Sequence, residues 1–278
     1  MALVDIHTHS NISPDGNDTP EEMASRAAEL GVRRFGLTDH LELDRASDEK
    51  WDPAAALKHM RPTYEKLHRE YDGRINVYFG VEIGQALHDT AAAEHILAEN
   101  DFDYVIGSIH RTEHYKNINL ISDIEHERRR AIAEHYEEML SLAEWGKFSI
   151  LAHMTFILRF TGVDTPSGLV TDKTKRSRAV FETHKPVIDK ILQTIISKEI
   201  ALEVNCSGYR HGLGGPMPSA EFIMRYRELG GRLVTVGSDA HRISDVASGI
   251  SEGCGLLKEL GFSEVCVFEK KEPKFIKI

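Results

Sequence analysis

Two histidines separated by a single residue stand near the start of the chain, in the segment VDIHTHSNISPDG at positions 4–16. Apolar Val4 and Ile6 alternate there with polar residues, which predicts a short strand that runs into a turn rich in Asn, Pro and Gly. Side chains two residues apart on a strand point to the same face, so His7 and His9 should lie side by side. The pair could bind a metal ion, or it could be an ordinary polar pair on the surface.

Similar residue types follow most of the other strand-like segments, in the sequences GLTDH, FGVEIG, IGSIH, ILAHM and VGSDAH. These residues are Asp39, His40, Glu82, His110, His153, Asp239 and His241. A single histidine after a strand is more often a hydrogen-bonded loop residue than a ligand, but six of the seven predicted strands end in this way. The carboxyl ends of the strands of a parallel barrel lie at one face, where such proteins carry their active sites. The joint pattern therefore predicts a metal site at that face.

The residue types indicate which metals such a site would bind. His, Asp and Glu without Cys are ligands of Zn, Mn or Fe, and their number exceeds what one ion needs. We therefore expect two or three divalent metal ions, with a carboxylate such as Glu82 bridging two of them. Asp15, in the loop after His9, is a further candidate ligand, although an Asp in the sequence SPDG is also a common turn residue.

The chain has 15 histidines, and their placement matters more than their number. Six of them lie in polar helical segments without matching partners, and we expect these on the surface. They are His59, His68, His95, His126, His135 and His184.

Strand-like and helix-like segments alternate along nearly the whole chain. The strand-like segments after the first are residues 33–40, 75–83, 103–110, 147–154, 200–208 and 232–241. One helical segment opens with a capping box of Thr19 and Glu22, and another contains Pro186, which should kink or divide it. Seven or eight such units predict a closed or nearly closed parallel barrel, with a doubly wound open sheet as the alternative. Since no long linker interrupts the pattern, we expect one domain over residues 1–278.

The composition narrows the class of protein. Hydrophobic residues make up 41% and charged residues 28% of the chain, as in ordinary globular proteins. A net charge of -10 argues against a broad nucleic-acid-binding surface. Three cysteines without a CxxC spacing favour a reducing compartment. Because neither a signal sequence nor an apolar run long enough to cross a bilayer is present, we expect a cytoplasmic protein.

The motifs and their order resemble the PHP (polymerase and histidinol phosphatase) superfamily along nearly the full chain. DIHTHS, GLTDH, GVEIG, IGSIH, LAHM and GSDAH carry the resemblance, and ALEVNCSGYR with the segment through GSDAH is most similar to the histidinol-phosphate phosphatases of this superfamily. The resemblance implies a distorted, TIM-like (β/α)7 barrel with three metal ions at the C-terminal ends of its strands.

Carried over residue by residue, the resemblance implies a ligand set for each metal. The first metal would be held by His7, His9, Glu82 and Asp239. Glu82 would bridge to a second metal, held by His110 and His153. The third metal would be held by Asp15, His40 and His241. Many members have His where this chain has Asp15, but the phosphatase branch often has Asp.

Two arginines follow predicted strand ends, Arg159 in FILRF and Arg210 in CSGYRHG. The guanidinium group offers a planar fork of donors that fits phosphate oxygens. The resemblance places phosphate-binding arginines in these two loops. We therefore expect both side chains to bind the phosphate group of a substrate.

Taken with these features, the resemblance implies a metal-dependent phosphatase of histidine biosynthesis, which would convert histidinol phosphate and water into histidinol and phosphate with a metal-bound hydroxide. A small phosphorylated molecule is then the expected partner, and no oligomeric state is predicted. His40, Asp15 or His241, if free of metal, could relay a proton to the leaving alcohol. One alternative is a PHP-type phosphoesterase acting on nucleotides or other small phosphate esters. The other is a PHP module that mediates interactions without catalysis.

Overall fold

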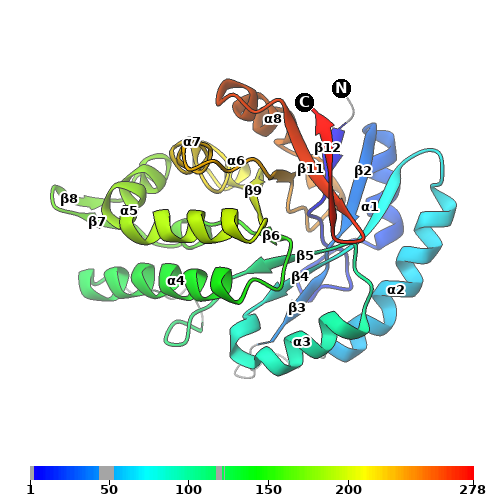
Figure 1. Ribbon diagram of the computed structural model, residues 1–278, viewed down its shortest axis with the longest axis horizontal. Coiled ribbons are helices and arrows are strands. Elements are labelled where there is room, and N and C mark those ends of the chain that lie inside the picture. The colour runs from blue at the N-terminus through cyan, green and yellow to red at the C-terminus, as the bar shows by residue number, and fades with distance from the viewer. Residues whose placement is uncertain (1–2, 44–52, 117–120, 122) are drawn as a thin grey trace.

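A parallel sheet of eight strands, curved into a nearly closed barrel, forms the centre of the structure, which is a computed structural model (Figure 1). It describes residues 3–43, 53–116, 121 and 123–278. Along the sheet the order is β1 (Leu3–Asp5), β2 (Val32–Leu37), β4 (Asn76–Gly84), β5 (Tyr104–Ser108), β6 (Ile150–Leu151), β9 (Ala201–Asn205) and β10 (Val234–Gly237). The short β3 (His40–Glu42) also pairs with β4. The predicted parallel barrel is confirmed, and the open doubly wound sheet is not formed.

The two ends of the sheet meet just beyond β1 and β10. The backbone N–H of Asp239 donates to the carbonyl of His7 at 2.8 Å, and the N–H of His9 donates to the carbonyl of Ala240 at 2.8 Å. Thr8 and Ala240 form an isolated parallel bridge between these donors. The barrel therefore closes among the residues that the sequence marks as metal ligands.

Helices follow most of the strands and lie outside the barrel (Figure 1). The longer helices are α1 (Pro20–Glu29), α2 (Pro53–Glu70), α3 (Thr90–Glu99), α4 (Glu125–Trp145), α5 (Lys173–Ser197), α7 (Ala220–Glu228) and α8 (Ile250–Glu259). Short helical turns are η1 (Ala86–Asp89), η3 (Phe156–Arg159), α6 (Ser207–Arg210) and η4 (Ile243–Asp245). The capping box is confirmed, because Thr19 and Glu22 each accept a backbone N–H from the other. The predicted break is confirmed as well: α5 kinks at His184, two residues before Pro186.

Two antiparallel hairpins were not expected from the strand pattern. One consists of β7 (Val163–Thr165) and β8 (Gly168–Val170), within the segment that reads as a polar loop, and Gly168, which follows its turn, has a φ of +119°. The other consists of β11 (Glu264–Glu269) and β12 (Glu272–Lys277) and lies beside the N-terminal strand (Figure 1). Both hairpins lie outside the barrel sheet, so neither alters the strand order that forms the site.

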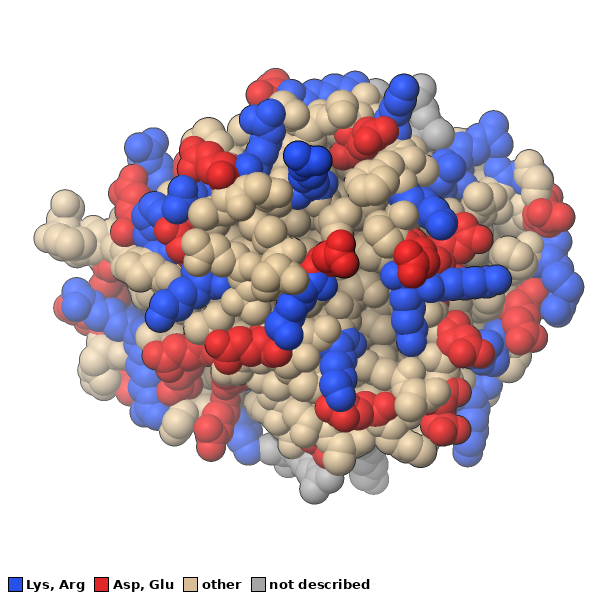
Figure 2. Space-filling model, in the orientation of Figure 1, with Lys and Arg blue, Asp and Glu red and all other residues tan. Residues whose placement is uncertain are grey.

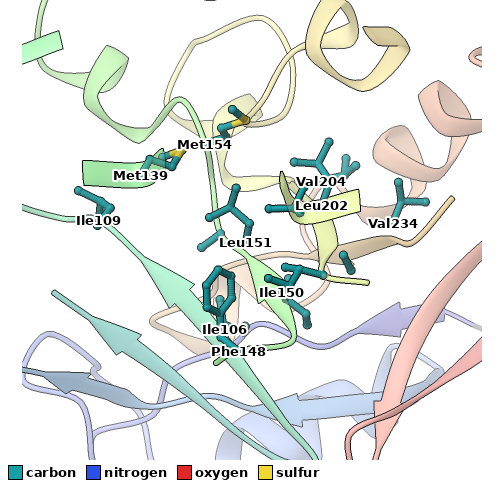
Figure 3. Close-up of a cluster of buried hydrophobic side chains, with 14 of the residues drawn as sticks. Ile106, Ile109, Met139, Phe148, Ile150, Leu151, Met154, Leu202, Val204 and Val234 are labelled. Atoms are coloured by element: carbon teal, nitrogen blue, oxygen red, sulfur yellow. The ribbon is translucent and has the colours of Figure 1, made fainter. Parts of the chain in front are cut away.

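Apolar side chains hold the strands in place from both faces of the sheet. Every residue of β5, β9 and β10 is buried, as expected for parallel strands that helices cover. Figure 3 shows part of this core, to which Ile106, Leu151 and Leu202 of three neighbouring strands and Met139 of α4 contribute. Full burial of one such side chain contributes about 1.5–3 kcal/mol. The core thereby fixes the strand ends that carry the polar site residues.

One surface prediction is wrong: His135 is fully buried. It lies on α4 four residues from Ala131 and from Met139, both of them buried, and therefore on the face of the helix that packs against the barrel. Burial lowers the pKa of His135 to about 3, so this imidazole is neutral. His184 is half-buried at the kink of α5, and the other four, His59, His68, His95 and His126, are exposed as expected.

Charges of both signs cover the outside of the molecule. On the face shown in Figure 2, Lys and Arg side chains alternate with Asp and Glu, and no broad basic stripe crosses this face. Among the helices of the described residues, none has the length and apolar character needed to cross a membrane.

Candidate metal centre

The two histidines after β1 meet two carboxylates in the interior. The Nε2 atoms of His7 and His9 are 3.0 Å apart, and both imidazoles are fully buried. They lie 3.2 and 3.3 Å from Glu82 Oε2 and 3.8 and 3.5 Å from Asp239 Oδ1. The structure thus brings together the four residues predicted for the first metal, here called the first cluster.

Glu82, in the buried interior of β4, joins this cluster to a second one. Its other oxygen, Oε1, lies 2.9 Å from Nε2 of His153 and 3.2 Å from Nε2 of His110. The two Nε2 atoms are themselves 3.3 Å apart. Glu82, His110 and His153 are here called the second cluster, and the two oxygens of Glu82 face different clusters, as a bridging carboxylate requires.

A third cluster has two of its members stacked on the ring of His9. The ring of His9 stacks between those of His40 and His241, with centroids 4.2 Å from each. Asp15 lies 3.6 Å from Nε2 of His40 and 3.2 Å from Nε2 of His241, and 59% of its side chain is exposed. Asp15, His40 and His241, the third cluster, thus form the more open rim of the site.

Buried aspartates fix the loops that carry these histidines. Asp39 accepts hydrogen bonds from the backbone N–H of Ser10 and the hydroxyl of Ser13, both at 2.7 Å, and so anchors the loop after β1. Asp5 accepts the backbone N–H and the hydroxyl of Ser238 and anchors the loop after β10. In that loop Asp239 adopts a φ of +53°, a left-handed conformation that is uncommon outside glycine. Asp39 follows a strand as the candidate ligands do, but its carboxylate holds the loop after β1 in place and belongs to none of the three clusters.

The donor set fits divalent transition metals. Several groups of three imidazole or carboxylate side chains, among them His9, His40 and His241, bring their ligand atoms within 4.8 Å of one another. The Nδ1 atom of His40 is buried and makes no hydrogen bond, although it lies 3.1 Å from Glu82 Oε2. A buried nitrogen without a well-formed hydrogen bond costs free energy, which coordination to a metal ion would offset.

Comparison with known proteins agrees with this geometry. The model of the PHP domain family matches residues 5–207. The chain belongs to the PHP domain family. It is 28% identical over 276 residues to a probable histidinol-phosphatase of Thermotoga maritima, with 97% of each chain covered. It is 24% identical over 282 residues to the histidinol-phosphatase of Lactococcus lactis, with 96% of this chain and 95% of that one covered.

Two solved structures show the same fold as this PHP chain. Histidinol phosphate phosphatase from Lactococcus lactis, complexed with Zn, L-histidinol and phosphate, matches with a TM-score of 0.79 and 22% identity, covering 98% of both chains. The putative histidinol phosphatase of Listeria monocytogenes matches with a TM-score of 0.73 and 18% identity, covering 89% of this chain and 98% of that one.

The charges of the PHP site are strongly coupled in the metal-free protein. Burial opposes ionisation of Glu82, but the imidazoles of His7, His110 and His40 outweigh burial and hold the pKa of Glu82 well below its usual value. Burial also disfavours the imidazolium of His40, yet the carboxylates of Glu82 and Asp15 raise its pKa to about 9. Metal-free His40 is therefore protonated at neutral pH, and a metal ion that bound there would have to displace its proton.

The two predicted phosphate-binding arginines differ in their contacts. The guanidinium carbon of Arg159 lies 5.0 and 5.2 Å from the ring centres of Phe156 and Phe160, and within the described residues this group has no hydrogen-bond or ion-pair partner. Arg210 instead donates to the backbone carbonyls of Ser238, at 2.6 Å, and of Asp239. Only Arg159 therefore offers all its donors to a ligand.

Sequence reasoning did not assign Glu203 or Glu42 to the metal centre. Glu203 accepts from Nδ1 of His7 at 2.5 Å, and Glu42 lies 2.8 Å from Nδ1 of His110. A signal for Glu203 was present, because a glutamate inside the apolar strand sequence ALEVN is rarely buried without a partner. The sequence does not show which partner it has.

Proposed function

We propose that this PHP protein is a metal-dependent phosphatase that hydrolyses histidinol phosphate to histidinol and phosphate. The observation that carries the proposal is the convergence of three histidine and carboxylate clusters on Glu82, with the unpaired guanidinium of Arg159 on the same side of the barrel. Curated relatives that match nearly the whole chain carry the name histidinol-phosphatase, which supports this choice of substrate.

Two or three divalent cations, drawn from Zn, Mn and Fe, are the cofactors that the donor types favour. His7, His9, Glu82 and Asp239 would hold the first, Glu82, His110 and His153 the second, and Asp15, His40 and His241 the third. Bound cations supply Lewis acidity and lower the pKa of a coordinated water from 15.7 toward about 7.

The chain itself would bind and orient the phosphate group. Arg159 lies close enough to Asp239 and Asp15 for their charges to act on it, and burial lowers its pKa because the cation is partly desolvated. A desolvated cation interacts more strongly with an anion than a solvated one does. Arg159 would therefore neutralise the phosphoryl oxygens as charge shifts in the transition state. Arg210 would add positive charge beside it while holding the loop of Asp239.

The leaving alcohol needs a proton, and the rim of the site offers one. Of the candidates Asp15, His40 and His241, only His40 is buried, whereas His241 has 25% and Asp15 59% of its side chain exposed. Nε2 of His241 lies 3.2 Å from Asp15 Oδ2. If the third cation is not bound, His241 would relay the proton, because it is the more exposed of the two imidazoles and its Nε2, which faces Asp15, can donate.

The test is phosphate release from histidinol phosphate and from a panel of nucleotides and sugar phosphates, with Zn or Mn added and with a chelated control. We expect a preference of several hundredfold in kcat/KM for histidinol phosphate, about 3–4 kcal/mol of transition-state discrimination. Slow and even turnover of the panel would reject the substrate but keep the phosphatase. Stoichiometric metal binding without any turnover would reject the enzyme and favour an interaction module.

A further inference from the structure

We propose that Glu203 and Glu42 are positioning residues of the metal centre, each holding one histidine so that its Nε2 points into a cluster. Glu203 acts on His7 of the first cluster, and Glu42 acts on His110 of the second. The proposal rests on the metal-dependent function above. Glu42 also belongs, with His40 and His110, to one of the groups whose ligand atoms lie within 4.8 Å of one another, but both of its oxygens are engaged by donors.

Glu203 joins three neighbouring parts of the barrel. Its Oε1 accepts from Nδ1 of His7 at 2.5 Å, and its Oε2 accepts from the backbone N–H of His153 at 2.8 Å and from Nδ2 of Asn205 at 3.1 Å. A carboxylate accepts and does not donate, so Nδ1 of His7 must carry a proton. The lone pair of the neutral ring is then on Nε2, the atom that faces Glu82 and His9.

The donors around Glu203 require a carboxylate and not an amide. Both of its oxygens face donors, and glutamine has only one oxygen. If the amide oxygen of a Gln faced His153 and Asn205, its NH2 would donate to Nδ1 of His7 and shift the proton to Nε2, toward the cluster. If the oxygen faced His7, the NH2 would oppose two buried donors. The first orientation disturbs His7 of the first cluster, and the second leaves the backbone of His153, a residue of the second cluster, without its acceptor.

Glu42 has the same arrangement at the second cluster. Its Oε1 lies 2.8 Å from Nδ1 of His110, whose Nε2 faces Glu82 and His153. Its Oε2 accepts from the side-chain amide of buried Gln85, in the amide orientation in which the Gln85 oxygen also accepts the backbone N–H of His110. Both oxygens of Glu42 are thus engaged by donors. His110 is held through its ring and through its backbone.

A glycine makes room for each carboxylate. A Cβ on Gly84 would lie 2.4 Å from both oxygens of Glu42. A Cβ on Gly237 would lie 2.3 Å from Cβ of His7 and 3.0 Å from Oε1 of Glu203. These distances are below or at the limit of normal contact, so both pairs depend on the absence of a side chain at these positions.

Carboxylates that orient metal-binding histidines typically contribute 10- to 100-fold in metal affinity. We would therefore compare Glu203→Gln and Glu42→Gln with Glu134→Gln. Glu134 is a matched control, because its Oε1 lies 2.9 Å from Nδ1 of His114, a histidine outside the three clusters. Zn dissociation constants from chelator competition, Zn content per chain and melting temperature would be measured. Nitrogen-15 spectra of Zn-loaded protein labelled at histidine would report on the ring protons.

In each of the two variants, we expect one of the bound Zn ions to have an affinity about 10- to 100-fold lower than in the native protein. In the control, the Zn affinity should not change. The Nδ1 signal of His7 should change only in Glu203→Gln, and that of His110 only in Glu42→Gln. Unchanged Zn affinity in a folded variant of either residue would overturn the proposal. If one variant does not fold, the other still decides, because the two glutamates lie on different strands.

The outcome also separates this proposal from the proposed function. Weaker Zn binding in the two variants, with a native protein that hydrolyses no phosphate ester, would uphold the positioning role and reject the phosphatase. If the native protein hydrolyses histidinol phosphate but both variants keep their Zn affinity, the phosphatase is upheld and the positioning role is rejected.

Discussion

Replacing Arg159 with methionine should separate phosphate binding from metal binding. The guanidinium of Arg159 contacts two aromatic rings and has no hydrogen-bond partner among the described residues, so the metal clusters do not depend on it. Arg159→Met keeps an apolar chain of similar length against Phe156 and Phe160. The substitution therefore removes the charge and the donors while leaving the surrounding packing largely in place.

The size of the effect follows from these contacts. A hydrogen bond between charged partners contributes about 1.5–3 kcal/mol, so losing one to the phosphate should lower kcat/KM roughly 10- to 150-fold. A cation–π contact at a partly exposed position contributes about 0.5–1 kcal/mol, so the free energy of unfolding should fall by only about 1 kcal/mol. Metal content should not change.

Arg210→Met is the matched comparison, because Arg210 holds the backbone carbonyls of Ser238 and Asp239 in the loop that carries a first-cluster residue. This variant should lose metal as well as activity. Steady-state kinetics with histidinol phosphate, metal analysis after dialysis and urea unfolding would be run on both variants. Loss of metal from Arg159→Met, or full kcat/KM in that variant, would refute the reasoning.

Three further predictions concern the clusters and their supports. Glu82→Gln should lower both metal content and phosphatase activity, because Glu82 faces two clusters; metal analysis beside a phosphate-release assay checks this. In metal-free protein the raised pKa of His40 contributes stability that is complete below pH 6.5 and lost as the pH rises through about 9, so urea midpoints should fall over that interval. Asp39→Asn should cost about 1–3 kcal/mol of unfolding free energy, because donors from Ser10 and Ser13 would face an amide; urea unfolding at constant metal measures it.

The candidate metal ligands could be found from the sequence because one geometric rule relates their positions. In a parallel barrel the carboxyl ends of all strands lie on one side, so residues just after strands meet whatever their separation along the chain. His7 and His153 follow two different strands, and they lie 3.2 and 2.9 Å from the two oxygens of Glu82 on a third. Strand pattern and residue type were therefore enough to predict this part of the site.

Residues within the strands, and the loop arginines, could not be predicted in the same way. Glu203 lies inside β9, and its contact with His7 depends on the direction in which the strand presents that side chain. Arg210 stands in a loop, where sequence does not show whether a guanidinium faces a ligand or a backbone carbonyl. For His135, the polar neighbours on its helix concealed that its own face packs against the barrel.

Barrel closure is what makes the contact between His7 and Glu203 available. In the strand order β1 and β10 are the two ends of the sheet, and β9 lies next to β10. In an open sheet His7, after β1, and Glu203, on β9, would therefore lie near opposite edges. Their hydrogen bond across 196 residues of sequence exists only because the ends meet. The metal centre and the closure of the barrel thus depend on the same contacts, so a substitution that weakens one should weaken the other.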